Sequence, residues 1–209
     1  MGQISLQIMT RELCHDLYKG WTNDASIYMD MKLFKPYTYN EDAVNRYFES
    51  KQDVSRVVFA IMLDAEVIGE LQLKQIDRDR KECTLSIHMQ NDSVKGKGYG
   101  TQAEKLAIKY AFEKLGMLAV NADAVLKNTR SQHVLEKVGF RFVKEEGIFR
   151  YYRVEQAESR SSKPICSVWP PFFACHCSLV IRMALGLEPW KGPTMPFSSI
   201  SSTIRAARA

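Results

Sequence analysis

The chain has 209 residues, of which 45% are hydrophobic and 25% charged, an ordinary composition for a soluble globular protein. Its net charge of +5 is uneven: residues 157–209 carry +4 and residues 1–156 only +1, which argues against a nucleic-acid-binding main domain. The five cysteines are odd in number and scattered, so we expect no disulfide framework and a reducing, cytoplasmic setting. The N-terminus alternates and soon becomes charged, which does not resemble a signal peptide.

The first fifty residues predict one strand and two helices. Residues 3–9 alternate apolar and polar side chains, the period of a half-buried strand. Thr10 is placed to cap a helix that follows at once. Asn40 is placed to cap a second helix, with two acidic residues in its first turn to complement the helix dipole.

Three strands are predicted next. Residues 54–63 and 66–76 are rich in apolar and β-branched side chains, and a short polar link joins them. Such a link is typical of a hairpin, so these two strands should be antiparallel. Residues 83–89 form the third strand, after a charged turn.

A glycine-rich loop and a helix over residues 101–115 follow, with an apolar stripe toward the core and Glu104 among the residues expected to face solvent. Residues 118–125 form the next strand. Because a helix separates this strand from the preceding one, the two can be parallel in a right-handed crossover. A short helix within residues 128–140 and a hairpin around Gly147 complete a mixed α/β domain.

Residues 157–209 differ from this domain, which we place at residues 1–156. They hold six of the seven prolines and nine serines, without a sustained period, and predict a poorly structured basic tail. The apolar run at 172–187 is too short and too interrupted by charge for a membrane span. Cys175-His176-Cys177 is too crowded to form one tetrahedral site, so we expect no metal there.

The stretch "VKGKGYGTQA" places three glycines directly before a helix. Glycine permits close approach of a ligand, and unpaired N–H groups at a helix start form an anion site. A Walker loop is excluded because Thr101-Gln102, not Lys-Ser/Thr, follows the last glycine. Gly98-x-Gly100-x-x-Ala103 matches a loose dinucleotide pattern, but that fold needs it in the first strand–helix turn. A connector without a ligand is the remaining alternative.

The loop can be read as Lys95-x-x-Gly98-x-Gly100, and some 30 residues later Asn128 opens a helix that ends in Glu-Lys-Val-Gly-Phe at 136–140. These two blocks resemble the acyl-CoA-binding core of the GNAT N-acetyltransferases, nearest the branch of ribosomal-protein N-terminal and small-amine acetyltransferases. The resemblance implies a GNAT-like α/β fold. In it, antiparallel N-terminal strands join a parallel pair that splays at a V-shaped cleft.

The resemblance also implies acetyl-CoA as co-substrate. Backbone N–H groups would form a nest for the pyrophosphate, with Lys95 and Lys97 adding charge. Asn128 would fix the pantetheine amide, and an N–H near Met89 would stabilise the oxyanion. The expected cofactor-binding residues are Met89, Lys95, Gly96, Lys97, Gly98, Tyr99, Gly100, Thr101 and Asn128.

The acid that protonates the departing thiolate is open. Many family members carry a Tyr directly before the Glu-Lys pair, but this chain has Leu135 there. Ser131, one helical turn earlier on the same face, is the first candidate. Tyr151 or Tyr152 is a second, and strand alternation allows only one of these two to point inward.

Glu70 and His88 are the candidate bases for the amine, because each lies on a strand expected to line the cleft. The acid-rich first helices suit a cationic acceptor such as a protein N-terminus, a polyamine or an aminoglycoside-like amine. We expect no metal, nucleic-acid or membrane partner, and a monomer or homodimer. The rival interpretation is a non-catalytic acyl-CoA-binding or regulatory module that lost its acid at Leu135.

Overall fold

The computed structural model describes residues 2–156, so the predicted tail at 157–209, including Cys175-His176-Cys177, lies outside the described residues. The order of helices and strands confirms the prediction, with three short 3-10 helices added. The elements are β1 (Ile4–Ile8), α1 (Arg11–Lys19), η1 (Ala25–Ile27), η2 (Met31–Leu33), α2 (Glu41–Ser50), β2 (Val57–Leu63), β3 (Glu66–Asp77), β4 (Glu82–Met89), η3 (Asp92–Val94), α3 (Tyr99–Glu113), β5 (Ala119–Val125), α4 (Thr129–Lys137), β6 (Arg141–Glu146) and β7 (Phe149–Glu155).

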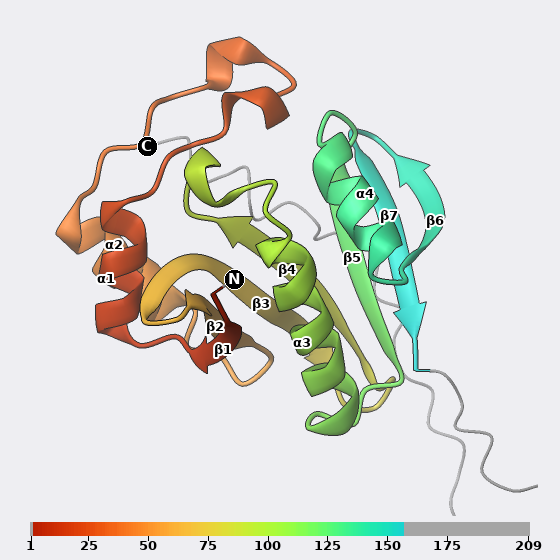
Figure 1. The fold of residues 1–209 in the computed structure, drawn as a ribbon. Helices are drawn as coiled ribbons and strands as arrows, with labels where there is room; N and C mark the ends of the chain where they lie inside the picture. Colours follow the sequence, from red (N-terminus) through yellow and green to blue (C-terminus); the bar gives the residue numbers. More distant parts are fainter. Residues whose placement is uncertain (1, 157–209) are drawn as a thin grey trace, which may run out of the picture. The chain divides into compact units, whose positions relative to one another are not determined.

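The seven strands form one sheet in the order β1-β2-β3-β4-β5-β7-β6 (Figure 1). The predicted hairpins β2–β3 and β6–β7 are antiparallel, and β4 and β5 form the one parallel pair of the sheet. The helix α3 makes the crossover between these two strands, as the sequence predicts. No helix among the described residues is both long and apolar enough to cross a bilayer.

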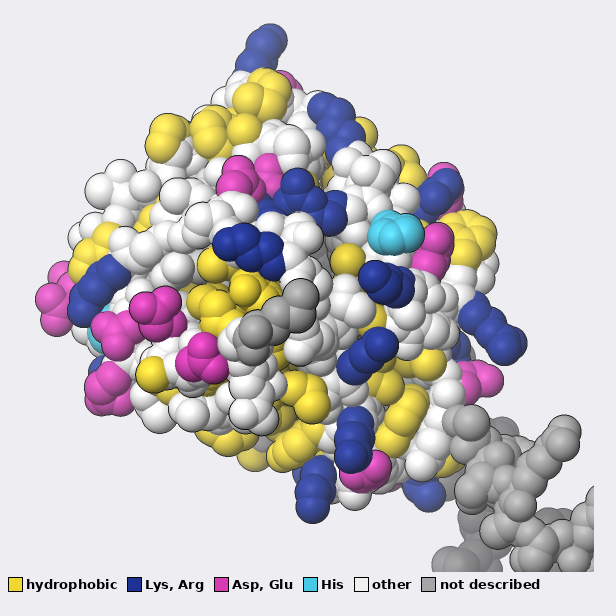
Figure 2. Space-filling model, viewed as in Figure 1, with side chains coloured by type: hydrophobic (Ala, Val, Ile, Leu, Met, Phe, Trp, Pro, Cys, Tyr) yellow, Lys and Arg dark blue, Asp and Glu magenta, His cyan; other side chains and the backbone are white. Residues whose placement is uncertain are grey.

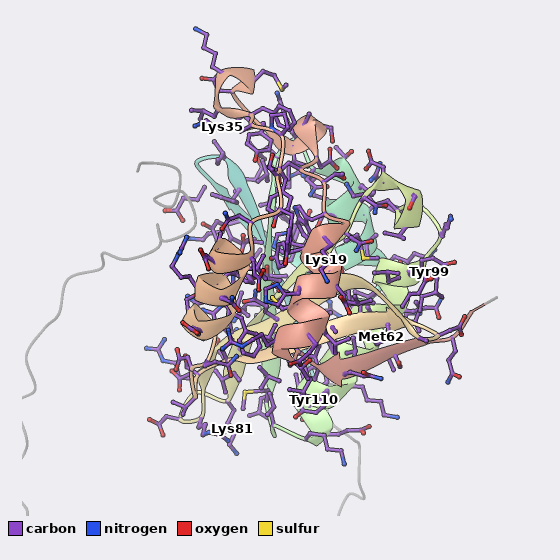
Figure 3. All side chains as sticks on the ribbon, turned by 90° about the vertical axis from the view of Figure 1, so that its left-hand side faces the viewer. Lys19, Lys35, Met62, Lys81, Tyr99 and Tyr110 are labelled. Carbon is purple, nitrogen blue, oxygen red and sulfur yellow. The ribbon has the colours of Figure 1, made fainter. Side chains whose placement is uncertain are left out.

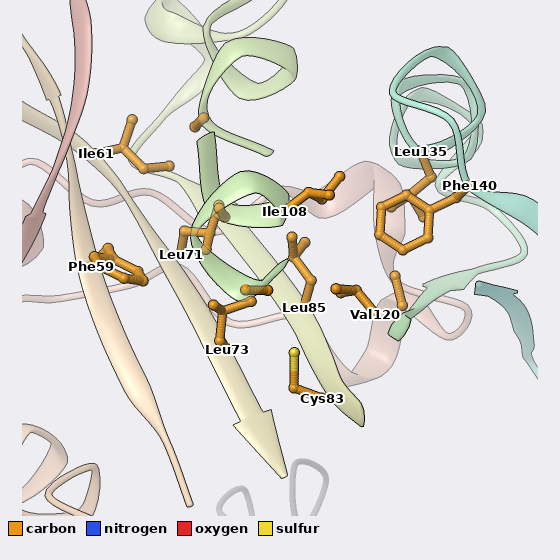
Figure 4. Close-up of a cluster of buried hydrophobic side chains, with 14 of the residues drawn as sticks. Phe59, Ile61, Leu71, Leu73, Cys83, Leu85, Ile108, Val120, Leu135 and Phe140 are labelled. Atoms are coloured by element: carbon orange, nitrogen blue, oxygen red, sulfur yellow. The ribbon is translucent and has the colours of Figure 1, made fainter. Parts of the chain in front are cut away.

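Helices cover both faces of the sheet. Apolar residues of α3 and α4 pack on one face, where Ile108 lies between Leu85 and Leu135 (Figure 4). Leu17 of α1 and Val44 of α2 belong to a separate buried cluster on the other face. Strand alternation divides the two clusters, since successive side chains of β2 and β3 point to opposite faces.

Side chains fix the start of most helices. Thr10 accepts a hydrogen bond from the backbone N–H of Leu13, and Asn40 accepts one from Ala43, as their cap positions predict. The helix α3 differs, because it begins after Gly98, which has φ of 81° and no side chain to make a cap.

Glu104 contradicts the expected solvent-facing side of α3. Its side chain is buried and the residue is 1% exposed, whereas Leu106, expected in the core, is 38% exposed. The helix α3 packs against both the sheet and α4, so its buried side is wider than that of a helix that contacts a sheet alone. Glu104 falls on the part of that side shared with Ile108, one turn further along the helix.

Candidate active site

The two parallel strands separate halfway along their length. They pair from Glu82 with Ala119 to Leu85 with Ala122, and no further. Beyond these positions β4 continues at 86–89 paired only with β3, and β5 continues at 123–125 paired only with β7. The unpaired segments at 86–89 and 123–125, together called the wedge below, confirm the predicted splayed pair (Figure 1).

Backbone groups of β4 point into the wedge. The N–H of Gln90 donates to the carbonyl of Ile68 in β3 at 2.9 Å. Because these groups alternate in direction along a strand, the N–H groups of Met89 and Ile87 point away from β3, toward β5. Met89, expected to supply an oxyanion donor, therefore presents its N–H to the wedge.

The opposite edge is equally free. The N–H of Leu126 donates to the carbonyl of Ile148 at 2.9 Å, on the side of β7. By the same alternation, Asp123 and Val125 present their N–H and C=O groups toward β4. The wedge thus offers backbone donors and acceptors on both sides, the arrangement that an extended amide-containing chain needs to pair as an extra strand.

The glycine loop lies at the β4 side of this opening. Gly96 and Gly98 have φ of 76° and 81°, the left-handed region that favours glycine. A Cβ at either position would meet no atom within 4 Å, so the backbone conformation, not packing, requires glycine there. A Cβ at Gly100 would lie 3.9 Å from Ile87 Cδ1 and 4.0 Å from Met89 Sδ, which places this turn of α3 over the end of β4.

The start of α3 is bare. Every other helix among residues 2–156 has a side chain that accepts from its first backbone N–H groups, but α3 has none. The N–H groups of Tyr99, Gly100 and Thr101 therefore lead the 15-residue helix without a cap. Unpaired N–H groups and the positive end of the helix dipole together favour a phosphate.

The side chain of Lys95 forms ion pairs within the protein. Its Nζ lies 2.7 Å from Asp24 Oδ2 and 2.8 Å from Asp92 Oδ1, and the side chain is 14% exposed. Two carboxylates therefore pair with this ammonium, and these contacts anchor the loop. Burial opposes ionisation of Asp24, but hydrogen bonds from Lys95 and Ser26 outweigh it and lower the pKa of Asp24 to about 2.

Free positive charge comes from other residues. Lys97 is exposed at the loop, and Figure 2 shows Lys and Arg side chains gathered over the face that α3 and α4 form. The exposed basic residues of these two helices and their flanks are Lys97, Lys105, Lys109, Lys114, Lys127, Arg130 and Lys137. Such a face attracts a polyanion before contact.

Asn128 and Ser131 stand together at the start of α4. Asn128 Oδ1 accepts from the backbone N–H of Ser131 at 3.0 Å, so the carbonyl oxygen caps the helix and the amide nitrogen is left for a ligand carbonyl. Ser131 is half-buried, and its hydroxyl makes no hydrogen bond to another described residue. Leu135, one turn on, is 2% exposed and packs in the core.

Glu70 lies on the other face of the sheet, beneath α1 and α2. It is 1% exposed and accepts a hydrogen bond from the hydroxyl of Tyr47 at 2.6 Å and another from the amide of Gln72. Its second oxygen, Oε2, has no partner among the described residues. A buried carboxylate with one free oxygen is a strong acceptor for a cationic group.

His88 pairs with Glu70 across β3 and β4, and its side chain lies on the same face. Its ring centre is 6.2 Å from that of Trp21, and the residue is exposed. Desolvation by the surrounding atoms lowers the pKa of His88, against the opposing effect of Glu70. The imidazole is therefore neutral at pH 7 and can accept a proton.

Several residues on this face carry no clear functional signal in the sequence. Asp123 is exposed on β5, across the wedge. Its negative charge, like that of Glu70, opposes the lowering of the His88 pKa. The rings of Trp21 and Tyr47 lie 5.1 and 5.2 Å from the ring of Tyr18. Aromatic richness near the first two helices was visible in the sequence, but its convergence beside Glu70 depends on the tertiary fold.

The two tyrosines of β7 point to opposite faces, as alternation predicts. Tyr152 is 1% exposed within the core under α4. Tyr151 lies on the other face and is half-buried, with Lys144 Nζ 5.1 Å from its ring centre. The hydroxyl of Tyr152 has no hydrogen-bond partner among the described residues.

The segment between α1 and α2 is tied to both sides of the wedge. Asp24 pairs with Lys95 after β4, and Lys127 after β5 donates to the carbonyls of Tyr28 and Met29 at 3.0 and 3.4 Å. In Figure 3 Lys35 marks the outer end of this segment, and Lys81 lies at the opposite end of the molecule. The segment therefore lies at the end of the sheet where β4 and β5 separate, and Lys81, just before β4, lies at the other end.

Comparison with known proteins gives a family. The family model described as "Acetyltransferase (GNAT) domain" matches residues 4–141. Among curated proteins, the Probable N-acetyltransferase YjcK of Bacillus subtilis (strain 168) is 34% identical over 87 residues, 42% of this chain and 46% of that protein. The spermidine N(1)-acetyltransferase of Escherichia coli (strain K12) is 27% identical over 118 residues, 56% of this chain and 62% of that protein. The chain spans about half the length of the curated relatives it matches.

Solved structures agree on the fold. The spermidine N-acetyltransferase from Vibrio cholerae, crystallised with CoA and spermine, superposes with a TM-score of 0.62 at 18% sequence identity. The superposition covers 74% of this chain and 96% of that one. With a family match over residues 4–141 and this shared architecture, the chain belongs to the GNAT family of acetyltransferases.

Proposed function

We propose that the protein is an acetyl-CoA-dependent N-acetyltransferase that acts on a primary amine by direct attack in a ternary complex. One observation carries the proposal: the unpaired backbone of the wedge lies directly beside the uncapped start of α3. An acyl-CoA has the two parts that these features suit, a pyrophosphate and an extended arm with two amides.

Acetyl-CoA would bind mainly through backbone groups. The N–H groups of residues 99–101 hold the pyrophosphate, and the exposed Lys97 adds charge near it. The pantetheine arm pairs with Ile87, with the C=O of Met89 and with the facing residues of β5. The amide nitrogen of Asn128 completes the site from the other side.

The acceptor amine would approach from the α1 and α2 face. Glu70 and Asp123 favour a cation there, and the rings of Tyr18 and Trp21 add an apolar wall with cation–π capacity. Two similar proteins carry names that describe spermidine acetylation, and another is described as a putative ribosomal N-acetyltransferase. These features support a small polycation or an exposed protein N-terminus as acceptor.

Acetyl transfer would take place between the acetyl-CoA site and the acceptor site. An ammonium group gives its proton to the neutral His88, directly or through one water, while Glu70 holds positive charge on the same face. The amine then attacks the thioester carbonyl. The N–H of Met89 stabilises the oxyanion. The attacking nitrogen loses its second proton to water as the tetrahedral intermediate collapses, and the expelled thiolate takes up a proton to leave as free CoA thiol.

Two measurements test this function. Thermal unfolding with and without acetyl-CoA measures binding, since a ligand of the folded state raises Tm. Thiol release on spermidine, an aminoglycoside and a short peptide with a free N-terminus measures turnover. A higher Tm with turnover on one acceptor is the expected result. Binding without turnover on any of them would favour the rival, a non-catalytic acyl-CoA-binding module, and no binding would contradict both.

A further inference from the structure

Glu104 is a buried carboxyl group that the cofactor and acceptor sites do not use. It lies on α3, is 1% exposed, and its Oε2 has no hydrogen-bond partner among the described residues. Burial of an unpartnered polar atom costs folding free energy, so such a group persists where function gains from it. The sequence predicted a solvated residue here.

The geometry of α3 places this carboxyl at the wedge. Gly100, one turn before Glu104, lies over Ile87 and Met89 at the end of β4. Ile108, one turn after it, lies beside Leu85, where β4 and β5 last pair (Figure 4). Glu104 shares the side of the helix that these two residues define. Glu104 therefore lies between them along α3, on the side of the helix that faces the end of the β4–β5 pairing.

The surroundings keep this carboxyl protonated. Burial alone raises the pKa of Glu104 to about 8, with no charged group contributing to the shift. The apolar core that includes residues of α3 also contains Leu85 of β4, Ala122 of β5 and Leu135 of α4. At pH 7 the group is a neutral acid with a proton to give.

We propose that Glu104 is the general acid that protonates the leaving thiolate. This inference rests on the proposed acetyl transfer. When the tetrahedral intermediate collapses, the C–S bond breaks and its electron pair goes to sulfur. The carboxyl O–H of Glu104 gives its proton to that sulfur, directly or through one water, which leaves free CoA thiol and a Glu104 carboxylate. The carboxylate regains a proton from solvent. The substrate nitrogen loses two protons, the first through His88 before attack and the second to water as the amide forms, so the net release is one proton.

Two features support this assignment over Ser131. An acid works best when its proton affinity is close to that of the group it protonates, and a thiol titrates near 8.5. A buried carboxylic acid meets this condition, whereas a serine hydroxyl is a far weaker acid. The α4 position that would otherwise supply a phenol is Leu135, which has no proton to give.

The test compares two identical substitutions on one helix. Glu104→Gln keeps the shape and polarity of the side chain but removes the transferable proton, and Glu113→Gln changes an exposed residue of α3. We expect Glu104→Gln to lower kcat about 100-fold, with acetyl-CoA affinity within about twofold of wild type, and Glu113→Gln to change neither. We also expect the wild-type kcat to fall above pH 8 as Glu104 ionises, and this limb to vanish in Glu104→Gln.

The other outcomes are also decisive. Full kcat in Glu104→Gln overturns the acid role, and so does a higher KM for acetyl-CoA at unchanged kcat, which would indicate a binding contact only. Glu104→Met, whose apolar side chain suits the buried site, must show the same loss of kcat even if the glutamine variant folds poorly. Absence of turnover in the wild type would contradict the proposed function itself, which separates that failure from failure of the acid.

Discussion

The two sides of the wedge present different kinds of groups to a ligand. On the α3 side the groups are backbone N–H groups from one continuous stretch, residues 96–101, at the start of a helix. On the α1 and α2 side they are side chains of Trp21, Tyr47, Glu70 and His88, which come from separate elements. The first side depends on backbone conformation, and the second depends on how distant segments pack.

This difference determines what a substitution does on each side. A backbone site tolerates most side-chain changes, provided that the glycine conformations persist and no new charge enters. A side-chain site loses its chemistry when a single group changes. The α3 side should therefore respond to substitutions of Gly98, and the α1 and α2 side to conservative changes of single polar residues.

The largest expected effect is on the α3 side. Gly98→Asp strains a residue with φ of 81° and places a carboxylate where we expect the phosphates. We expect acetyl-CoA affinity to fall at least about 100-fold, since charge-assisted hydrogen bonds to phosphate are replaced by repulsion. Isothermal titration measures this directly.

Gly147→Asp is the matched control for that change. Gly147 has φ of 62° in the β6–β7 turn, so the substitution carries similar backbone strain at a distance from the loop. Wild-type affinity is expected there. Retained binding in Gly98→Asp would show that the loop is not the phosphate site.

A comparable effect on turnover is expected from His88→Gln on the acceptor side. Loss of the proton acceptor should lower kcat about 100-fold while leaving the Kd of acetyl-CoA unchanged. Because the pKa of His88 is lowered, wild-type kcat should rise at acidic pH and level off before pH 7. His133→Gln, on the exposed surface of α4, is the control and should match wild type. If kcat is unaltered in His88→Gln, His88 is not the base, and Glu70 becomes the candidate.

The next effect concerns the free energy of unfolding, which depends on the buried carboxyl of Glu104. The folded-state pKa of Glu104 is raised from 4.5 to about 8, so its ionisation in the unfolded chain opposes folding. This cost is absent below pH 4.5, grows as pH rises, and levels off above pH 8, reaching about 3 kcal/mol at pH 7.

Glu104→Met should therefore raise the free energy of unfolding by about 3 kcal/mol at pH 7, and by much less at pH 4.5. Urea unfolding at the two pH values measures the difference. A stabilisation that does not depend on pH would mean that Glu104 is not a buried neutral acid. Together with lower kcat, the expected result would be a gain of stability at the expense of activity.

The smallest effect concerns the ion pair between Asp24, in the segment after α1, and Lys95 in the glycine loop. Asp24→Asn keeps a residue that can cap η1 but removes the charge that pairs with Lys95. We expect KM for acetyl-CoA to rise about threefold as the loop loses an anchor, in line with a modest ion pair. Asp30→Asn makes the same change at the cap of η2, without such a partner, and should leave KM unaltered. Equal KM values in both variants would show that the tie does not support the loop.

The same contrast explains how far the sequence could be read. Element order, hairpins, caps at Thr10 and Asn40, and the glycine loop followed from local patterns, because each depends on neighbours in the chain. The pairing of Lys95 with Asp24 joins residues 71 positions apart, and no local signal indicates it. The burial of Glu104 depends on α4 packing beside α3, while a charged residue in a helix pattern indicates solvent. The tail, the oligomeric state and the cytoplasmic setting stay predictions.

Acetyl-CoA is expected to bind to the free backbone groups at the wedge and at the start of α3. Amide hydrogen exchange of the wild-type protein, with and without acetyl-CoA, tests it residue by residue. We expect new protection at Ile87, Met89 and residues 99–101, and none in the β1–β2 pair. Protection confined to other elements, or binding without protection at these amides, would contradict it.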